Sequence, residues 1–426
     1  MSLGRTARVI ACCAASALVF GLVGIAPAAA DRGDGRSGHD HAELFVSPRG
    51  SARESGRSCR SATFTSIGAA VTAAPTGGTV VVCEGTYKED VLVNKVLTLS
   101  GRDATIDATG LENGIQVVAS RVRVEGFTIE NANGEGVLVG VYTMADAHLL
   151  PASGRVLSHV TVDGNNVSDN NKGFSSTGVA NCKYPGDCGG GIHFNVTTRS
   201  VASNNTVKNN SDGILLTDDY GPSSYNVVEH NVVDNNLSEC GIVLPSHSSS
   251  AVTFNPTTFA ITAVNPTLGG VYGNIVRDNI ADGNGTDLAP PQFGGGGSGS
   301  GIGLFGSGPG SAVYNNVVEN NEASGNGLAG IALHAHLPGG EDINGNVLTH
   351  NRLGTNNLGG DGFDGPPTTD FQTTGIAIYS AVTAHMTITD NRIHDDKIGI
   401  WLSKTITAHG LHDNDYKHVG TKVFVG

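Results

Sequence analysis

The sequence predicts an all-β solenoid, in which short coils of chain stack on one another along one axis. Two observations support this fold class, and the stretch from Gly191 to Asn236 shows both. The chain there twice reads Gly-Ile-x-apolar, passes a polar turn, and then reads Asn-x-Val-x-x-Asn. The glycines at positions 191 and 213 lie 22 residues apart, a spacing typical of solenoid repeats. One such coil cannot bury its own apolar face, so it must stack on a neighbour.

Both motifs recur through most of the chain. Glycine followed by alternating apolar residues predicts a short strand with one buried face, and asparagine at a bend tolerates left-handed backbone and can bond the next coil. The 61 glycines do not indicate collagen, which needs glycine at every third position, or a disordered chain, which would lack the apolar alternation. The other Gly-apolar strands begin at Gly114, Gly136, Gly241, Gly301, Gly330, Gly375 and Gly399, and the asparagine motifs at Asn165, Asn205, Asn231, Asn279, Asn321, Asn351 and Asn391.

The first residues have the pattern of an export signal. Arg5 and Arg8 precede an apolar run, and Ala28 to Ala30 supply a small-residue cleavage site, so residues 1–30 are interpreted as a signal peptide. Residues 31–43 are polar, charged and glycine-rich, which predicts a disordered leader. We therefore expect a secreted, extracellular protein whose solenoid spans residues 44–426. No other segment is long and apolar enough to predict a membrane span.

An amphipathic helix is predicted ahead of the first full coils. Phe64, Ile67, Ala70, Val71 and Ala74 have helical spacing, and Pro75 with the following glycines ends the helix. Strand alternation follows in TVVVCEG and VLVNKVLTLSG. Such a helix would cover the open end of the first coil, which otherwise exposes its core and unpaired strand edges.

This order of motifs resembles a known family. The chain has, in this order, a helix, Ala-Pro-x-Gly-Gly, Val-Val-Val, Glu-Gly-Thr-Tyr and Val-x-Lys-x-Leu-Thr-Leu-x-Gly. In this it resembles the N-terminal capping region of the pectate-lyase-like superfamily. The resemblance covers roughly residues 44–426 and implies a secreted right-handed parallel β-helix with an N-terminal capping helix. The superfamily includes lyases, hydrolases, esterases, epimerases and non-catalytic members, so the resemblance does not define a reaction.

Charge and cysteines limit the partners and the compartment. The chain has 39 acidic and 25 basic residues and a formal net charge of −14, which argues against nucleic acid as a partner. Cys12 and Cys13 belong to the signal peptide, and secretion makes disulfides plausible for the remaining cysteines. We expect disulfides Cys59–Cys83 and Cys182–Cys188, with Cys240 as a buried thiol. The alternative pairs Cys240 with Cys182 or Cys188.

Insertions into the repeats indicate which face of the solenoid is the binding face. They flank the Gly-Ile strand on both sides, near residues 142–155, 173–190, 246–270, 285–300, 306–311 and 354–374, whereas the bend before Asn-x-Val stays short. Loops in solenoids collect on the binding face, so we expect a groove along the exterior of the Gly-Ile strand. The alternative is that these are only tolerated surface loops.

The candidate catalytic residues come from three successive coils at one edge of that strand: His193, Asp218, Asp219 and His247. Paired carboxylates can divide into an ionised and a protonated group, which supplies base and acid for glycosidic cleavage, and histidine can move a proton. The alternative interpretation is an ordinary Asp-Asp-Tyr-Gly-Pro turn with solvated histidines. Further along the same face we expect substrate contacts from Phe305, His334, Tyr379 and Trp401.

Family motifs leave the reaction open. Adjacent aspartates resemble those of polygalacturonase-like hydrolases, and Ala408-His409-Gly410 is similar to their Gly-His-Gly, but the companion Asn-Thr-Asp and Arg-Ile-Lys motifs are not in the expected order. The pectinesterase Gln-Asp-Thr-Leu and pectate-lyase Trp-Ile-Asp-His motifs are missing. A lyase would need a basic residue as its base, and Arg199, Arg277 and Lys404 are available.

A calcium site is the one metal site that a motif suggests. Residues 359–364 read Gly-Gly-Asp-Gly-Phe-Asp, one copy of a repeat that binds Ca²⁺ in tandem, so Asp361 and Asp364 are its candidate ligands. The alternative is a glycine-rich loop with solvated acids. The histidines near the C-terminus have no closed spacing for zinc or copper.

Taken as a whole, the sequence predicts a secreted, monomeric β-helix protein that binds and processes an extracellular polysaccharide by a hydrolase-, lyase- or epimerase-type reaction. The alternative is a non-catalytic cell-surface or matrix protein that adheres to carbohydrate through the same face.

Overall fold

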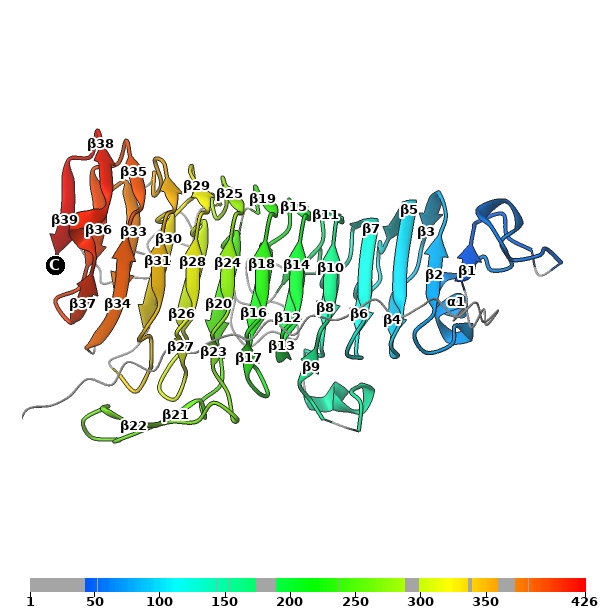
Figure 1. Cartoon of the computed structure of the whole chain (residues 1–426), viewed down its shortest axis with the longest axis horizontal. Helices are drawn as coiled ribbons and strands as arrows, with labels where there is room; N and C mark the ends of the chain where they lie inside the picture. Colours follow the sequence, from blue (N-terminus) through cyan, green and yellow to red (C-terminus); the bar gives the residue numbers. More distant parts are fainter. Residues whose placement is uncertain are drawn as a thin grey trace, which may run out of the picture. The chain divides into compact units, whose positions relative to one another are not determined.

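The computed structural model describes residues 43–426, apart from residues 52, 143, 153, 174–188, 237, 288–298, 336–338, 359–371 and 382. The predicted signal peptide and all but the last residue of the leader lie outside the described residues. Residues 41–426 form one unit in which strands stack coil on coil (Figure 1). The first strand, β1 (Glu43–Val46), begins one residue before the expected boundary.

Parallel strands from successive coils form three sheets within the described ranges. The sheet built from the Gly-apolar strands, here called the eleven-stranded sheet, contains β4 (Val91–Val93), β6 (Ile115–Val117), β8 (Val137–Val139), β12 (Gly190–Asn195), β16 (Asp212–Thr217), β20 (Ile242–Ser246), β26 (Ile302–Gly306), β30 (Ile331–Ala335), β33 (Thr374–Tyr379), β36 (Ile398–Leu402) and β39 (Thr421–Val425).

The largest sheet contains the strands around the asparagine motifs. Its members are β1, β2 (Thr79–Val82), β3 (Gly85–Tyr87), β5 (Thr98–Asp107), β7 (Arg123–Glu130), β10 (Thr161–Asp163), β11 (Asn166–Ser168), β14 (Val201–Ser203), β15 (Thr206–Lys208), β18 (Val227–Glu229), β19 (Val232–Asp234), β24 (Ile275–Arg277), β25 (Ile280–Asp282), β28 (Val317–Glu319), β29 (Glu322–Ala323), β31 (Val347–Thr349), β32 (Arg352–Leu353), β34 (Ala384–Thr389), β35 (Arg392–His394), β37 (Ile406–His409) and β38 (Asp415–Lys417).

A narrow third sheet and one hairpin complete the strands. The third sheet contains β9 (Leu157–Ser158), β13 (Thr197–Thr198), β17 (Ser223–Ser224), β23 (Val271–Tyr272) and β27 (Val313–Tyr314). The hairpin pairs β21 (Val252–Phe254) with β22 (Ile261–Val264) antiparallel, and it lies within the insertion at residues 246–270. The insertion after β8 carries the 3-10 helix η2 (Met144–Leu149), and a further 3-10 helix, η4 (Leu411–Asp413), lies near the C-terminus.

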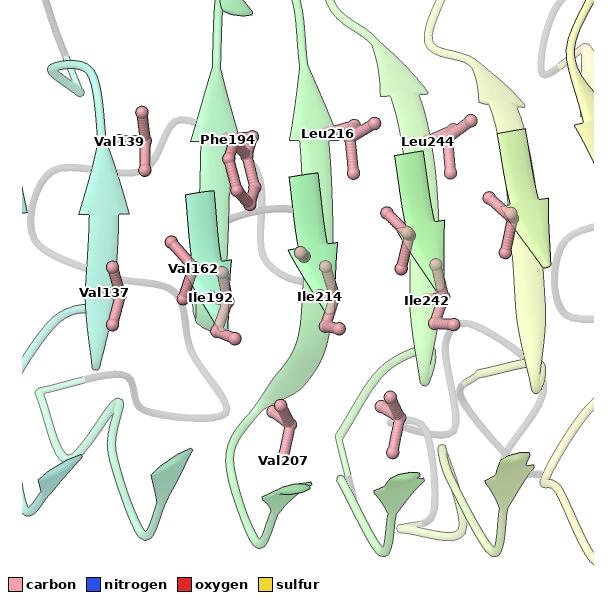
Figure 2. Packing of buried hydrophobic residues seen from close by; sticks show 14 of the residues in the cluster. Val137, Val139, Val162, Ile192, Phe194, Val207, Ile214, Leu216, Ile242 and Leu244 are labelled. Carbon is pink, nitrogen blue, oxygen red and sulfur yellow. The ribbon is translucent and has the colours of Figure 1, made fainter. Parts of the chain in front are cut away.

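Aliphatic side chains form ladders inside the coils. Ile192 aligns with Ile214, and Ile214 aligns with Ile242, in the pairings of β12, β16 and β20. All three side chains are fully buried, and Figure 2 shows them side by side with the second buried residue of each strand. The strand period of two therefore turns the intervening residues to the outer face of the sheet, as the sequence pattern predicts, although His193, Leu215 and Val243 are buried there.

Asparagine ladders hold the bends together, and three of them run through the described coils. The backbone N–H of Asn205 donates to Asn231 Oδ1 at 2.9 Å, while Asn205 Nδ2 donates to the Val162 carbonyl of the preceding coil at 3.0 Å. The same contacts repeat from coil to coil. Each asparagine side chain accepts from a backbone N–H and donates to a backbone carbonyl of the preceding coil, while its own backbone N–H donates to the side chain of the next coil. The ladders contain Asn165, Asn205, Asn231, Asn279, Asn321, Asn351, Asn391 and Asn414; Asn170, Asn210, Asn236, Asn284, Asn326, Asn356 and Asp396; and Ser200, Asn226, Asn274, Asn316 and Asn346.

The predicted capping helix is confirmed as α1 (Ile67–Ala73), shorter than the apolar spacing suggested. Its side chains Ile67, Ala70 and Val71 are buried against the first coils. Ser66 caps the helix, and the carboxylate of Glu89 accepts from the backbone N–H groups of Ile67 at 2.9 Å and Gly68 at 3.0 Å. A carboxylate at this position complements the positive end of the helix dipole.

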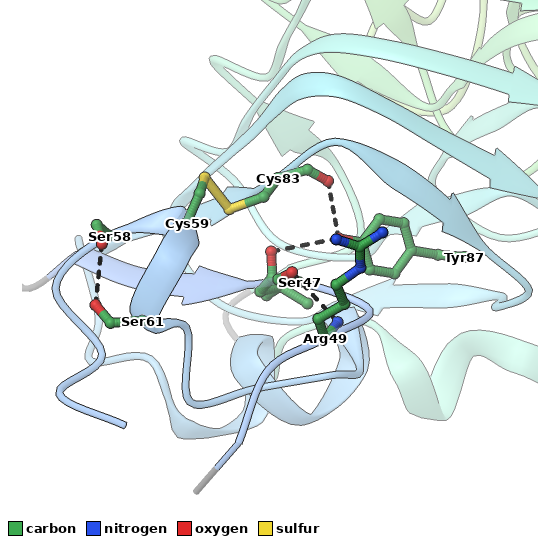
Figure 3. The surroundings of a disulfide bond; sticks show 8 residues. Ser47, Arg49, Ser58, Cys59, Ser61, Cys83 and Tyr87 are labelled. Atoms are coloured by element: carbon green, nitrogen blue, oxygen red, sulfur yellow. Dashed lines mark hydrogen bonds between the residues drawn. A yellow bond between two sulfur atoms is a disulfide. The ribbon is translucent and has the colours of Figure 1, made fainter. Parts of the chain in front are cut away.

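The disulfide Cys59–Cys83 is confirmed and joins the 3-10 helix η1 (Cys59–Ser61) to the residue that follows β2 (Figure 3). Cys182 and Cys188 lie outside the described residues, so their expected pairing stays a prediction. Cys240 is buried as expected, and its sulfur accepts from Ser300 N–H at 3.3 Å. Among the described residues, none of the helices has the length and apolar character needed to cross a bilayer.

One ladder position carries a carboxyl group instead of an amide. Asp396 Oδ1 accepts from Asn356 N–H at 3.2 Å, as an asparagine would, but Oδ2 occupies the place where the ladder amides donate to a carbonyl. Burial, chiefly, and the nearby charge of Asp395 raise the pKa of Asp396 from 3.8 to about 8. A protonated carboxyl can donate like an amide, so the ladder is complete only while Asp396 is neutral.

We therefore expect a pH-dependent stability that Asp396→Asn removes. The pKa of Asp396 is raised in the folded state, so the folded protein binds this proton more tightly than the unfolded chain, and the free energy of unfolding falls as pH rises from about 4 to about 8. Asp396→Asn should match wild type near pH 4 and be more stable, by up to a few kcal/mol, near pH 8. Chemical denaturation at both pH values measures the difference.

The matched control is Asn391→Asp, which places a carboxyl at a buried position in the neighbouring ladder. It should acquire the same loss of stability with rising pH. Identical pH profiles for wild type and Asp396→Asn would contradict this explanation.

Candidate functional site

The four predicted catalytic residues lie on neighbouring coils of the eleven-stranded sheet. His193 is in β12, Asp218 and Asp219 directly follow β16, and His247 directly follows β20. β16 pairs with both β12 and β20. The stacking register therefore brings Asp219 into contact with side chains from the coils on either side.

Asp219 is a partly exposed carboxylate held by three side chains. Its Oδ1 accepts from His247 Nδ1 at 2.6 Å, and its Oδ2 accepts from Asn195 Nδ2 at 2.5 Å and from Thr217 Oγ1 at 3.2 Å. The Asp219 side chain is 27% exposed and that of His247 is 18% exposed. Asp219 is thus fixed from three neighbouring coils, yet it keeps access to solvent.

His193 lies deeper, behind Asp219. Its Nε2 lies 2.7 Å from Thr217 Oγ1, and its Nδ1 lies 3.0 Å from Glu135 Oε1. His193 is almost fully buried and Glu135 completely so. A hydrogen-bonded chain therefore runs from Glu135 through His193 and Thr217 to Asp219.

Asp218 has a different environment from its neighbour. It is completely buried, and its carboxyl accepts from Ser246 Oγ at 2.8 Å and from the backbone N–H groups of His247 at 2.6 Å, Ser248 at 3.1 Å and Gly270 at 2.5 Å. Ser246 and Gly270 are the two ends of the hairpin insertion. Asp218 thereby fastens both ends of the insertion, and with them His247, to the coil that carries Asp219.

The surroundings of the two adjacent aspartates shift their pKa values in opposite directions. Burial raises the pKa of Asp218, although the charge of His247 and the surrounding hydrogen bonds oppose this effect. Burial also disfavours ionised Asp219, but other interactions outweigh it. These are the hydrogen bond and charge of His247, the charge of His193 and the Asn195 hydrogen bond. The pKa of Asp219 therefore lies below 3.8. Asp219 is therefore ionised at neutral pH. Such a division of two carboxyl groups is typical of acid–base sites.

Two tyrosines complete the site. The ring of Tyr142, from the insertion after β8, meets the His193 ring edge-on at 6.3 Å, and its hydroxyl accepts from Glu135 N–H at 3.1 Å. Tyr220 Oη accepts from Val141 N–H at 3.2 Å and packs against the core beside Asp219. Burial raises the pKa of both hydroxyls, so both tyrosines remain neutral.

Sequence reasoning missed Glu135, Asn195, Thr217 and both tyrosines as members of the site. Glu135 had a detectable signal, because it is an acidic residue directly before a Gly-apolar strand. Asp212 is the other residue of this kind among the Gly-apolar repeats. Asn195 and Thr217 occupy aligned positions in β12 and β16. They could have been found by following the outward positions along neighbouring strands.

The predicted substrate contacts form two separate clusters. Phe305 and His334 stack on each other with ring centroids 4.1 Å apart. Trp401 packs with Tyr379 and Phe424 at the C-terminal end. Phe305, His334 and Trp401 are almost fully buried and only Tyr379 is partly exposed, so these outward-facing rings largely cover one another. Their role as substrate contacts stays a prediction.

The expected calcium ligands Asp361 and Asp364 lie outside the described residues. Within the part of the chain that is described, no group of three or more His, Cys, Asp or Glu side chains is placed to hold a metal ion. Near the C-terminus, the two oxygens of Asp395 accept from His394 and His418 at 2.9 Å each.

Comparison with known families defines the class of protein. The family model described as the right-handed β-helix region matches residues 102–262, and with the parallel register it identifies the chain as a right-handed parallel β-helix protein. This confirms the predicted fold, a right-handed parallel β-helix.

A second family model, described as periplasmic copper-binding protein (NosD), matches residues 298–421. The described residues of this range contain no cluster of three metal-binding side chains. Because their donor groups do not fit a copper site, we derive no step through copper.

No curated protein sequence matches the chain. Solved structures with a similar fold include an alginate lyase from Paenibacillus sp. str. FPU-7, with 14% identity, 84% of this chain and 96% of that chain covered, and a TM-score of 0.47. For the A-module of mannuronan C-5 epimerase AlgE4 from Azotobacter vinelandii, the identity is 14% and the TM-score is 0.44. The alignment covers 84% of this chain and 92% of that chain. For the GH136 lacto-N-biosidase from Eubacterium ramulus, the identity is 12% and the TM-score is 0.45. The alignment covers 90% of this chain and 67% of that chain. We draw no functional argument from these similarities.

The anchoring role of Asp218 makes a specific prediction. Asp218→Ala should leave four buried donors without their acceptor, lower the free energy of unfolding by about 3 kcal/mol and release the hairpin insertion. Amide exchange at Ser248 and Gly270 should become faster than in wild type, which hydrogen-exchange mass spectrometry measures.

Asp278→Ala is the control, since that aspartate is exposed and its contacts with His230 and Arg277 are both 3.9 Å long. It should leave exchange in the insertion unchanged. Unaltered exchange at Gly270 in folded Asp218→Ala would show that Asp218 is not the anchor.

Proposed function

We propose that the protein is a secreted, extracellular β-helix enzyme that binds a polysaccharide and processes it by acid–base chemistry at Asp219 and His247. One observation supports this proposal most strongly. An ionised, partly exposed carboxylate is held by side chains from three neighbouring coils, and a second, fully buried carboxyl lies directly beside it. A surface turn that only solvates its aspartates would not need such positioning.

The arrangement supplies the groups that polysaccharide chemistry requires. The carboxylate of Asp219 can accept a proton, or stabilise positive charge that develops on a sugar ring. The imidazole of His247, hydrogen-bonded to Asp219 through Nδ1, can deliver or remove a proton. Hydrolysis, elimination and epimerisation all need such a transfer, and the products distinguish them.

A specific surface favours the second candidate, a non-catalytic carbohydrate-binding protein. Tyr225, Tyr272 and Tyr314, here called the tyrosine stripe, lie on successive coils at the third sheet. Tyr272 and Tyr314 stack at 4.9 Å, Tyr225 meets Tyr272 edge-on at 5.7 Å, and Arg199 lies 5.6 Å from the Tyr225 ring centroid. Tyr225 is 53% exposed, so its ring is available to stack on a sugar.

The remaining parts of the proposal concern the state of the protein. An exported chain with the Cys59–Cys83 disulfide fits an oxidising compartment. We propose that it acts as a monomer on a polysaccharide, not on nucleic acid or at a membrane. Calcium bound by Asp361 and Asp364 is a further proposal, which the assay below includes.

The test is a screen of the purified protein against neutral and acidic polysaccharides, with and without added calcium. Hydrolysis yields new reducing ends, elimination yields unsaturated products that absorb ultraviolet light, and epimerisation changes the sugar composition without cleavage. We expect one of these products from wild type. Asp219→Asn should lower its rate by about 100-fold or more, because it removes the base while keeping the shape.

Asp278→Asn serves as the matched control, because it removes a surface carboxylate near a histidine outside the site. It should leave the rate unchanged. Absence of all three products, with retained binding that is lost in Tyr225→Ala, would favour the adhesive function. Full activity in folded Asp219→Asn would refute the proposed site.

A further inference from the structure

The acid–base pair is connected to a buried carboxylate that the proposed reaction does not use. Glu135 lies two residues before β8, is completely buried, and has its Oε1 3.0 Å from His193 Nδ1. Asn171 Nδ2 contacts the other oxygen at 3.4 Å. Burying an isolated carboxylate is costly unless a partner of opposite charge or a proton compensates it. His193 and Tyr142 are titratable residues among the described groups that contact Glu135, and of these two only the imidazole can become positively charged.

The hydrogens of this chain can be counted. Three links must be filled: Glu135 to His193, His193 to Thr217 at 2.7 Å, and Thr217 to Asp219 at 3.2 Å. Thr217 has one hydroxyl hydrogen. If that hydrogen points at a bare His193 Nε2, the oxygens of Thr217 and Asp219 face each other with no hydrogen between them. If both His193 nitrogens carry hydrogens, Thr217 accepts from His193 and donates to Asp219, and every link is filled.

We infer that Glu135, His193 and Thr217 form a buried relay that positions Asp219: Glu135 keeps His193 doubly protonated, and His193 turns the Thr217 hydroxyl toward the Asp219 carboxylate. A buried carboxylate needs a partner of opposite charge, and the ring that bonds Glu135 Oε1 can supply it. The three are positioning residues, because they reach the reacting group only through Asp219.

The relay places charges in a fixed order. Glu135 is negative, His193 positive and Asp219 negative, and Asp219 also accepts from Asn195 and His247 on its remaining sides. Three further titratable groups adjoin this chain. Tyr142, beside His193 and Glu135, and Tyr220, beside Asp219, are neutral phenols, and the buried carboxyl of Asp218 lies next to Asp219. Loss of the cation or of the hydroxyl link should therefore make Asp219 easier to protonate. How this affects turnover rests on the proposed function, whereas the titration itself does not.

The test follows the carboxyl carbon of Asp219 by ¹³C NMR in protein labelled at aspartate, with the signal assigned by its loss in Asp219→Asn. Thr217→Val removes the hydroxyl but keeps the shape, and Thr217→Ser restores the hydroxyl. We expect the pH midpoint of Asp219 to rise by about one unit in Thr217→Val and to stay at the wild-type value in Thr217→Ser. A merely structural role would not separate these two variants.

A second variant secures the result if Thr217→Val does not fold. Glu135→Gln removes the charge that holds His193 doubly protonated, and it should raise the midpoint of Asp219 in the same direction. Wild-type titration of Asp219 in folded Thr217→Val or in folded Glu135→Gln overturns the relay, and so does an equal shift in the valine and serine variants. None of these measurements needs a substrate, so failure of the polysaccharide screen and failure of the relay are separate outcomes.

Discussion

The stacking of coils through buried asparagine ladders is the constraint on which the rest of the structure depends. Each ladder asparagine bonds the preceding coil through its side chain and the next coil through its backbone N–H, and this fixes which residue lies above which. Because the side chains of a strand alternate between its faces, a slip of one residue would turn Ile214 outward and Leu215 inward. The contacts between His193, Thr217 and Asp219 exist only in the observed register.

The candidate site forms where the regular stack is interrupted. His247 belongs to an insertion between two coils, and such a segment would be mobile without a fixed attachment. The buried carboxyl of Asp218 supplies this attachment through four hydrogen bonds at both ends of the insertion. One aspartate therefore stabilises the frame while its neighbour faces the solvent. The rigid scaffold places the reacting groups, and the insertion supplies one of them.

Much of the fold could be predicted because it follows from local patterns. The alternation in the Gly-apolar strands defines the interior, and α1 and the Cys59–Cys83 disulfide follow from helical spacing and from cysteines that flank it. The same alternation brought His193, Asp219 and His247 to one edge. It could not show which outward residues are covered, and for this reason the burial of Phe305, His334 and Trp401 was missed.

The long-range contacts of Glu135 and Asp218 could not be predicted for a different reason. Glu135 contacts His193 across 58 positions of sequence, and Asp218 contacts Gly270 across 52. Both contacts depend on the lengths of insertions and on the direction in which a side chain leaves a bend. Periodicity predicts which face a residue occupies, but it contains no information on these two quantities.

The most direct measurement is a crystal structure of Asp219→Asn with an oligosaccharide of the polysaccharide that the protein recognises. We expect a sugar ring beside position 219 and His247, with a glycosidic oxygen or a ring carbon that bears the transferred hydrogen within about 3.5 Å of one of these side chains. An oligosaccharide seated on the tyrosine stripe, with position 219 facing only solvent, would contradict the account.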